Sequence, residues 1–162
     1  LGAVAAGVQY YGTDVSPETI AGCGCLAVDL GVQEMVTVVN SPAENADPPK
    51  GCALVFTSPP YFAQERYRGG KQSHTSYTNY QDWLDGFLHP LCRRAWDCLV
   101  DGGHLALNVA DIRNRGVCYP LSDDTIKSAV KAGFSHVETL RYPIASLGAK
   151  RQGWEPVLVF RK

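Results

Sequence analysis

Short apolar segments alternate with amphipathic segments along most of the chain. The short segments are rich in β-branched and aromatic residues and end in turn-forming residues, which is typical of buried strands. They occupy residues 9–15, 35–40, 52–56, 104–109, 135–142 and 156–162. The connection between the last two is too short for a helical crossover. We therefore expect these two strands to form an antiparallel hairpin at one edge of a sheet.

Helical patterns lie between these strands. Ser16, Pro17 and Glu18 supply an N-cap, a first-turn proline and a first-turn acid, so a helix is predicted to begin there. A second helix is expected over 122–132, with Ser122 as its cap and a glycine just past its end.

The longest helical pattern covers residues 78–99 and contains a proline, Pro90, near its middle. We expect a long amphipathic helix that is interrupted or bent near Pro90 and ends at the sequence Val-Asp-Gly-Gly. Its apolar positions recur at three- and four-residue spacing: Trp83, Phe87, Leu88, Leu91, Ala95 and Leu99.

The alternation of strands and helices predicts an α/β fold with a mostly parallel, Rossmann-like sheet that closes with an antiparallel hairpin. A chain of 162 residues, 45% of them hydrophobic, is long enough for one domain over 1–162 with a substantial core. No apolar run approaches the roughly 20 residues of a membrane span, and the first residues lack a signal-peptide pattern. We therefore expect a soluble, cytoplasmic protein.

Charge and cysteine content narrow the possible functions only slightly. The net charge of -1 gives no global signal for nucleic acid, although it does not exclude an enzyme that acts on DNA. Basic residues gather in segments that we predict to be loops, at 66–71, 113–115 and 150–151. The six cysteines are scattered, so we expect structural thiols and no metal site.

The strand at 52–56 stops at Ser58-Pro59-Pro60-Tyr61. Ligands of open parallel sheets bind beyond the carboxyl ends of the strands, where this segment is expected. The prolines fix the backbone and remove two N–H groups, which leaves the Ser58 hydroxyl and the carbonyls as rigid acceptors beside the flat ring of Tyr61. Such acceptors suit a planar molecule with an exocyclic amine, because hydrogen bonds from the amine direct its lone pair toward a methyl donor. A simple Pro-Pro turn that caps a strand is the alternative.

With this motif the chain resembles the S-adenosylmethionine-dependent DNA amino-methyltransferases, which methylate N4 of cytosine or N6 of adenine. Their signature is Ser, Asp or Asn followed by Pro-Pro and an aromatic residue, and residues 58–61 match it in full. The resemblance implies a catalytic segment, Ser58, Pro59, Pro60 and Tyr61. Ser58 and the Pro59 carbonyl would hold the target amine, while Tyr61 would stack on a base flipped out of double-stranded DNA. Serine in the first position favours cytosine N4 as the methylated atom, although some of the family's adenine enzymes also have serine there.

The same resemblance implies S-adenosylmethionine as cofactor. Residues 10–19 resemble the strand whose terminal acid, here Asp14, accepts hydrogen bonds from the ribose hydroxyls. On sequence alone, Asp14 is explained equally well as a turn residue before a helix. The implied cofactor-binding residues are Asp14, Val15, Asn40, Ser41, Ala43 and Ser58.

A long Gly-rich segment over 62–77 follows the motif and combines cationic with aromatic side chains. It is predicted either to contact phosphates and close over a flipped base, or to be an ordinary surface loop. The substrate-binding residues implied by the resemblance are Phe62, Glu65, Arg66, Tyr67, Asn108 and Asp111.

The chain departs from this family at its start, because the family's first strand and its Gly-rich turn, of the Phe-x-Gly-x-Gly type, have no counterpart. That strand is central in the family's sheet, between the segments at 9–15 and 52–56. We therefore expect an N-terminally incomplete domain whose sheet is completed by further residues or by another copy of the chain in a homo-oligomer. The alternatives are a non-catalytic remnant or DNA-binding subunit, and an RNA or protein amine methyltransferase.

Overall fold

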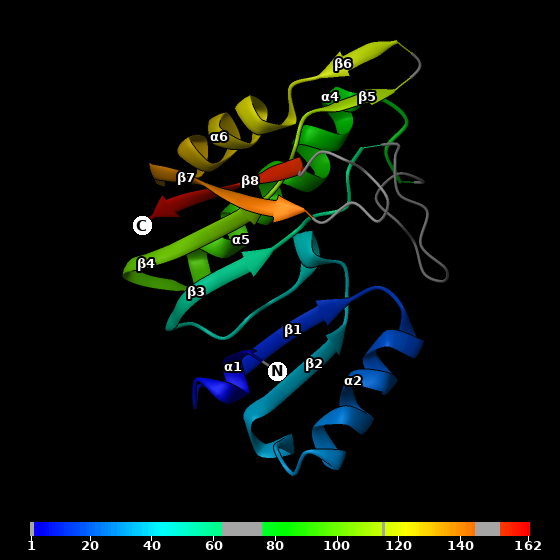
Figure 1. Ribbon diagram of the computed structural model, residues 1–162, viewed down its shortest axis with the longest axis vertical. Helices are drawn as coiled ribbons and strands as arrows, with labels where there is room; N and C mark the ends of the chain where they lie inside the picture. Colours follow the sequence, from blue (N-terminus) through cyan, green and yellow to red (C-terminus); the bar gives the residue numbers. More distant parts are fainter. Residues whose placement is uncertain (1, 63–75, 115, 145–152) are drawn as a thin grey trace.

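The computed structural model describes residues 2–62, 76–114, 116–144 and 153–162, and Figure 1 shows their arrangement. A two-stranded sheet pairs β1 (Tyr10–Asp14) with β2 (Val36–Asn40). A four-stranded sheet has the order β3 (Cys52–Thr57), β4 (Leu99–Asn108), β8 (Gly153–Arg161) and β7 (Ser135–Ile144). A small ribbon pairs β5 (Ile112–Asn114) with β6 (Val117–Tyr119).

The strand pairing is mixed. Among the described strands only β1 with β2, and β3 with β4, are parallel, whereas β8 runs antiparallel to both of its neighbours. The predicted hairpin of the last two strands is confirmed, with β7 at the edge of the sheet. In the four-stranded sheet β3, β4 and β7 therefore run in one direction and only β8 opposes them, as expected for parallel strands that close with an antiparallel hairpin. The described strands nevertheless divide into two sheets, with no pairing between β1 and β3.

Apolar side chains remain exposed on the two strands that flank this division. In Figure 1, β2, β1, β3 and β4 follow one another from bottom to top, with the division between β1 and β3. Leu54 and Phe56 of β3 are 60% and 65% exposed, and Tyr10 of β1 is 46% exposed. Strands of parallel sheets are normally covered on both faces, so this exposure is unusual.

The helix predicted after Ser16 is confirmed as α2 (Pro17–Asp29), whose first turn has the expected cap. The Thr19 backbone N–H donates to Ser16 Oγ at 3.2 Å. Short helical segments complete this half of the chain: α1 (Gly2–Ala5), η1 (Gln33–Met35) and η2 (Ala43–Asn45).

The long helix forms in three parts, α4 (Tyr80–Trp83), the π-helix η3 (Leu84–Leu88) and α5 (His89–Cys98). The predicted interruption near Pro90 is confirmed, and its cause is visible. Pro90 has no N–H for the carbonyl of Gly86, which instead accepts a hydrogen bond from the Tyr77 hydroxyl at 2.6 Å. All six predicted apolar positions are buried, although the last of them is the first residue of β4: Trp83, Phe87, Leu88, Leu91, Ala95 and Leu99.

The next strand begins earlier than the sequence predicts. The Val-Asp-Gly-Gly segment, expected as a stop, lies inside β4, which starts directly after α5. The early start comes from β3, because Leu99 lies opposite Cys52 in the parallel register. The two glycines are held by Lys162, since Gly102 N–H donates to the Lys162 carbonyl and Lys162 N–H donates to the Gly103 carbonyl, both at 3.0 Å. Gly102 adopts φ +79°, a conformation that favours glycine.

Helix α6 (Leu121–Ala132) begins one residue before the predicted start, so Ser122 lies in its first turn and is not the cap. Asp111 stabilises this end of the helix instead, because its Oδ1 accepts from the Ser122 N–H at 2.9 Å. The predicted glycine stop is confirmed at Gly133, with φ +120°.

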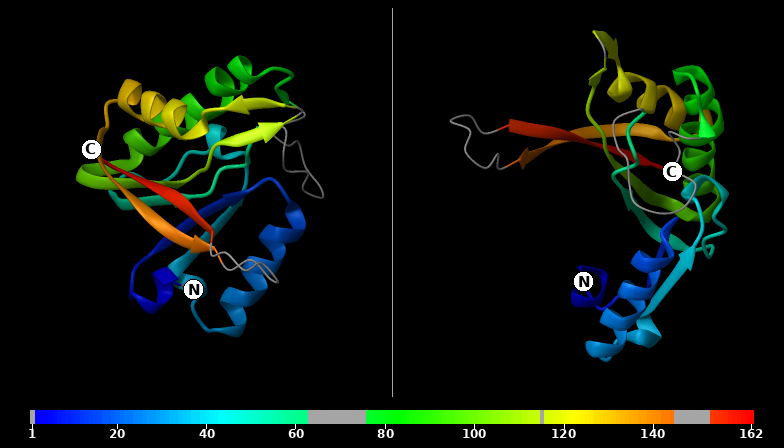
Figure 2. Two further views of the ribbon diagram at one scale, coloured as in Figure 1. Left: turned by 45° about the horizontal axis from the view of Figure 1, so that its top comes forward. Right: turned by 90° about the vertical axis from the view of Figure 1, so that its right-hand side faces the viewer.

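The buried core has two parts. One lies between β4, β8, α5 and α6, and helices α5 and α6 pack side by side in both views of Figure 2. The second is built around Trp83 and includes Phe62 and Ile112. All six cysteines are free thiols, and burial raises the pKa of Cys92 to about 12. Among the described helices, none has the length and apolarity that a membrane crossing requires.

Candidate active site

The Ser58–Tyr61 motif directly follows the carboxyl end of β3, where the sequence places it. Ser58 is exposed and Pro59 is buried, while Pro60 and Tyr61 are half-buried. The buried proline fixes the backbone next to an accessible serine hydroxyl. The segment therefore presents Ser58 to solvent from a rigid support.

Tyr61 connects the motif to the end of the neighbouring strand. Its hydroxyl accepts a hydrogen bond from the Ala110 backbone N–H at 3.0 Å, two residues after β4 ends. Its ring packs against both parts of the core. Tyr61 thus holds the carboxyl ends of β3 and β4 in a fixed relation.

Phe62 lies inside a cluster of aromatic rings, which we call the aromatic cluster: Phe62, Tyr80, Trp83, Phe87 and Tyr119. Its ring centroid is 5.5 Å from that of Tyr80 and 5.4 Å from that of Tyr119. Phe62 is only 7% exposed. In this structure its ring anchors the motif to the protein, and the side chain is not open to a ligand.

The carboxyl ends of β1 and β2 bring together Asp14, Asn40 and Ser41. Asp14 pairs with Asn40 in the strand register, and the Asp14 carbonyl accepts from Asn40 Nδ2 at 2.9 Å and from the Ser41 N–H at 3.1 Å. Val15 follows β1 and is half-buried. Ala43 begins η2 and packs against the second part of the core.

The Asp14 carboxylate is partly used within its own turn. Its Oδ1 accepts from the Ser16 N–H at 2.7 Å, as expected of a residue before a helix. The other carboxylate oxygen has no hydrogen bond to any described residue. The side chain therefore retains an acceptor for a ligand at this end of the strand.

Asn108 and Asp111 both lie near the end of β4, and both side chains already have partners. Asn108 Nδ2 donates to the Pro156 carbonyl at 3.1 Å, which ties β4 to β8. Asp111 accepts from Ser122 at the start of α6. The remaining predicted substrate-binding residues, Glu65, Arg66 and Tyr67, lie outside the described residues.

Burial raises the pKa of two ionisable side chains, Glu44 and Tyr80. Burial raises the pKa of Glu44 in η2 above its ordinary value. Burial also raises the pKa of Tyr80, with the hydrogen bond to Asp124 as a second cause. Tyr80 therefore remains a neutral phenol that donates to Asp124 at 3.0 Å.

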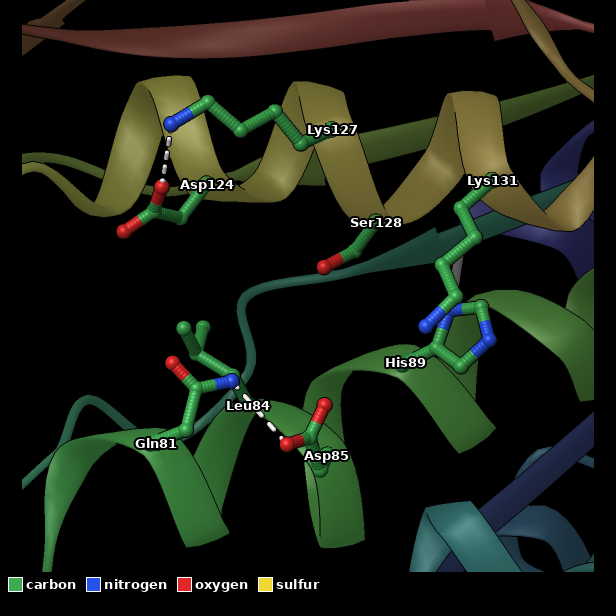
Figure 3. A pocket seen from close by; sticks show the side chains of 8 residues that line it. All are labelled: Gln81, Leu84, Asp85, His89, Asp124, Lys127, Ser128 and Lys131. Atoms are coloured by element: carbon green, nitrogen blue, oxygen red, sulfur yellow. Dashed lines mark hydrogen bonds and ion pairs between the residues drawn. The ribbon is translucent and has the colours of Figure 1, made fainter.

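A cavity of about 230 Å³ lies elsewhere, between the α4–α5 segment and α6 (Figure 3). Its lining consists of Gln81, Leu84, Asp85, His89, Asp124, Lys127, Ser128 and Lys131. Lys127 Nζ pairs with Asp124 at 2.8 Å, and Gln81 Nε2 donates to Asp85 at 2.9 Å. None of the predicted site residues lines this cavity, and the described residues hold no group of three or more potential metal ligands.

Sequence reasoning missed two features near the motif. The Ala110 N–H that holds Tyr61 belongs to the backbone, so no side-chain pattern reveals it. The β5–β6 ribbon lies where a loop was expected; Gly116 before β6, at φ +83°, was the available signal.

No protein-family model matches the chain. A curated relative, the type II methyltransferase M.MjaVI of Methanocaldococcus jannaschii, is 28% identical over 120 residues, which cover 74% of this chain and 59% of the relative. TTHA0409 of Thermus thermophilus, a candidate DNA modification methylase solved in complex with S-adenosyl-L-methionine, is 25% identical with a TM-score of 0.57. That match covers 75% of this chain and 53% of TTHA0409.

A methyltransferase from Pyrococcus furiosus, 18% identical, superposes with a TM-score of 0.62 over 94% of this chain and 62% of its own, which shows a shared fold. The chain thus spans between half and two thirds of each of these proteins. It is homologous to a type II methyltransferase and to a candidate DNA modification methylase, and it has a methyltransferase-like α/β fold with a mixed sheet.

Proposed function

We propose that this chain is the catalytic part of an S-adenosylmethionine-dependent DNA methyltransferase. The target is the exocyclic amine of cytosine (N4) or adenine (N6) in double-stranded DNA. The observation that carries the proposal is the Ser58–Tyr61 motif, exposed at the carboxyl end of β3, in a chain homologous to DNA modification methylases. The motif supplies acceptors, which is the chemistry that an aromatic amine needs.

The residues of the motif act by holding the amine. Ser58 Oγ and the Pro59 carbonyl each accept one N–H of the target, which draws the nitrogen toward tetrahedral geometry and frees its lone pair. A base is not needed before attack, because the amine becomes acidic only once it carries the methyl group, and the proton then leaves to water. The ring of Tyr61 supports the flipped base by stacking.

The residues at the ends of β1 and β2 suit the cofactor. S-adenosylmethionine supplies a methyl group on a positively charged sulfur. The Asp14 carboxylate oxygen without a described partner can accept from a ribose hydroxyl. Asn40 at the end of β2 and Ser41 after it both hydrogen-bond to the Asp14 carbonyl, and Ala43 follows at the start of η2. Val15 and Ser58 border the same edge of the two sheets.

A further strand, from residues outside 1–162 or from a second copy of the chain, completes the sheet between β1 and β3. Unpaired backbone groups along two strand edges are costly when the strands are central, and the exposed Leu54 and Phe56 indicate that a covering segment belongs there. The Gly-rich turn that follows this strand in the family would complete the cofactor site. A DNA-binding subunit without transfer activity is the second candidate function, and the division of the sheet favours it.

Calorimetric titration of S-adenosylmethionine into the folded 162-residue chain tests the cofactor site. We expect micromolar binding if a second copy completes the sheet, and we expect Asp14→Ala to weaken it about tenfold, since one charged acceptor contributes about 1.5 kcal/mol. Glu34→Ala, which removes a carboxylate from η1, is the control and should bind as the wild type does. Equal affinity of Asp14→Ala and wild type would contradict the role of Asp14; no binding by folded wild type would show that these residues need the further strand.

Transfer of a labelled methyl group to duplex DNA tests the function itself. Digestion of the product to nucleosides and mass spectrometry should identify N4-methylcytosine or N6-methyladenine. A methylated carbon of cytosine, or label in RNA or protein only, would contradict the proposal. DNA binding without any transfer would instead support the second candidate function.

A further inference from the structure

The β5–β6 ribbon extends from the end of the molecule that carries the candidate active site. In Figure 1 the ribbon lies at the end toward which β3 and β4 point, and in the right-hand view of Figure 2 it projects beyond the helices. The ribbon begins two residues after Ala110, whose N–H holds the Tyr61 hydroxyl. Its position is therefore linked to the motif through a short, fixed stretch of backbone.

The base of the ribbon is rigidly anchored on one face. The paired residues Ile112 and Tyr119 share that face, because residues opposite each other in an antiparallel pair point to the same side. Ile112 is 3% exposed, and the Tyr119 ring lies 5.4 Å from Phe62 and 4.8 Å from Tyr80 in the aromatic cluster. Phe62 is adjacent to Tyr61, so the ribbon and the motif share one anchor.

The opposite face of the ribbon carries an available cation. Arg113 and Cys118 pair across it, and both are exposed. No carboxylate of the described residues forms an ion pair with Arg113; the two ion pairs of the described part of the chain belong to Arg93 and Lys127. The guanidinium is thus held on a short, rigid ribbon and not neutralised by the described protein.

We propose that this face of the ribbon is a docking surface for duplex DNA, with the Arg113 guanidinium bound to a backbone phosphate near the target nucleotide. This inference rests on the proposed function and adds the element that positions the duplex. An arginine fork matches the oxygens of a phosphate, and a two-stranded ribbon is a shape that proteins lay against DNA grooves. The contact fixes the position of the DNA and carries no sequence information by itself.

Binding of a fluorescent 20-base-pair duplex, measured by anisotropy at several salt concentrations, tests this surface. Arg113→Ala should weaken binding about three- to tenfold and reduce the slope of log K against log salt by about 0.9, the value for one lost phosphate contact. Arg113→Lys should keep most of the slope. Arg94→Ala, which removes an exposed arginine from α5, is the control and should leave the slope unchanged.

Three outcomes would contradict the proposed docking surface: an unchanged salt slope in Arg113→Ala, an equal loss of DNA affinity in Arg94→Ala, or no binding of DNA by the wild type. Parallel assays of methyl transfer separate this proposal from the proposed function. If methyl transfer does not depend on Arg113, the proposed function is supported and the proposed docking surface is contradicted. DNA binding that depends on Arg113, without any transfer, supports the docking surface and favours the second candidate function, a DNA-binding subunit.

Discussion

Ser58→Ala is expected to slow methyl transfer about 10²- to 10³-fold while S-adenosylmethionine binds almost as before. The substitution removes one of the two acceptors that the motif offers to the target amine, and loss of one well-placed hydrogen bond to a reacting group has effects of this size. Ser58 is exposed, and among the described residues no hydrogen bond depends on its side chain, so folding should be little affected. Single-turnover transfer to duplex DNA and calorimetric cofactor binding measure the two effects separately.

Three further variants sharpen this test. Ser58→Asn and Ser58→Asp keep a side-chain acceptor, and both should retain more activity than Ser58→Ala because the signature that the motif resembles accepts either residue. Ser128→Ala removes a hydroxyl from the cavity beside α6, away from the motif, and should leave the rate unchanged. A rate for Ser58→Ala equal to that of the wild type would contradict the role given to the hydroxyl.

Local sequence signals predicted the features of the fold that depend on a few neighbouring residues. The Ser16 cap and the Gly133 stop each rest on backbone conformations that the residue itself favours, so the sequence was sufficient. The early start of β4 and the hydrogen bond from Ser122 to Asp111 depend on partners distant along the chain, and the sequence predicted neither.

The candidate site shows the same contrast. The position of Ser58 after β3 followed from an apolar run and two prolines. Asn108 and Asp111 were predicted to face the substrate. In the structure the Asn108 side chain donates a hydrogen bond to β8, and the Asp111 side chain accepts one from α6. These partners are distant along the chain, so only the folded structure reveals them. The anchoring of Phe62 in the aromatic cluster likewise arises from residues far apart in the sequence.

Gly86→Ala is expected to destabilise the protein by about 2 kcal/mol, although alanine normally favours helices. An added Cβ would lie 2.8 Å from Cζ and 3.0 Å from the hydroxyl oxygen of Tyr77. Overpacking of this kind costs about 1–3 kcal/mol, and displacement of Tyr77 also loses its hydrogen bond to the Gly86 carbonyl, worth about 1 kcal/mol. The gain in helix propensity, about 0.5–1 kcal/mol, offsets only part of this loss.

A second helical glycine, Gly22, serves as the control for this change in the free energy of unfolding. Gly22 lies inside α2 with no atom near its added Cβ, so Gly22→Ala should stabilise the protein by about 0.5–1 kcal/mol. Urea unfolding measures both changes. In the background Tyr77→Ala, Gly86→Ala should lose most of its cost, because the clash and the hydrogen bond are already absent. If both alanines stabilise the wild-type protein, Tyr77 does not pack on Gly86. The π-helix would then be caused by Pro90 alone.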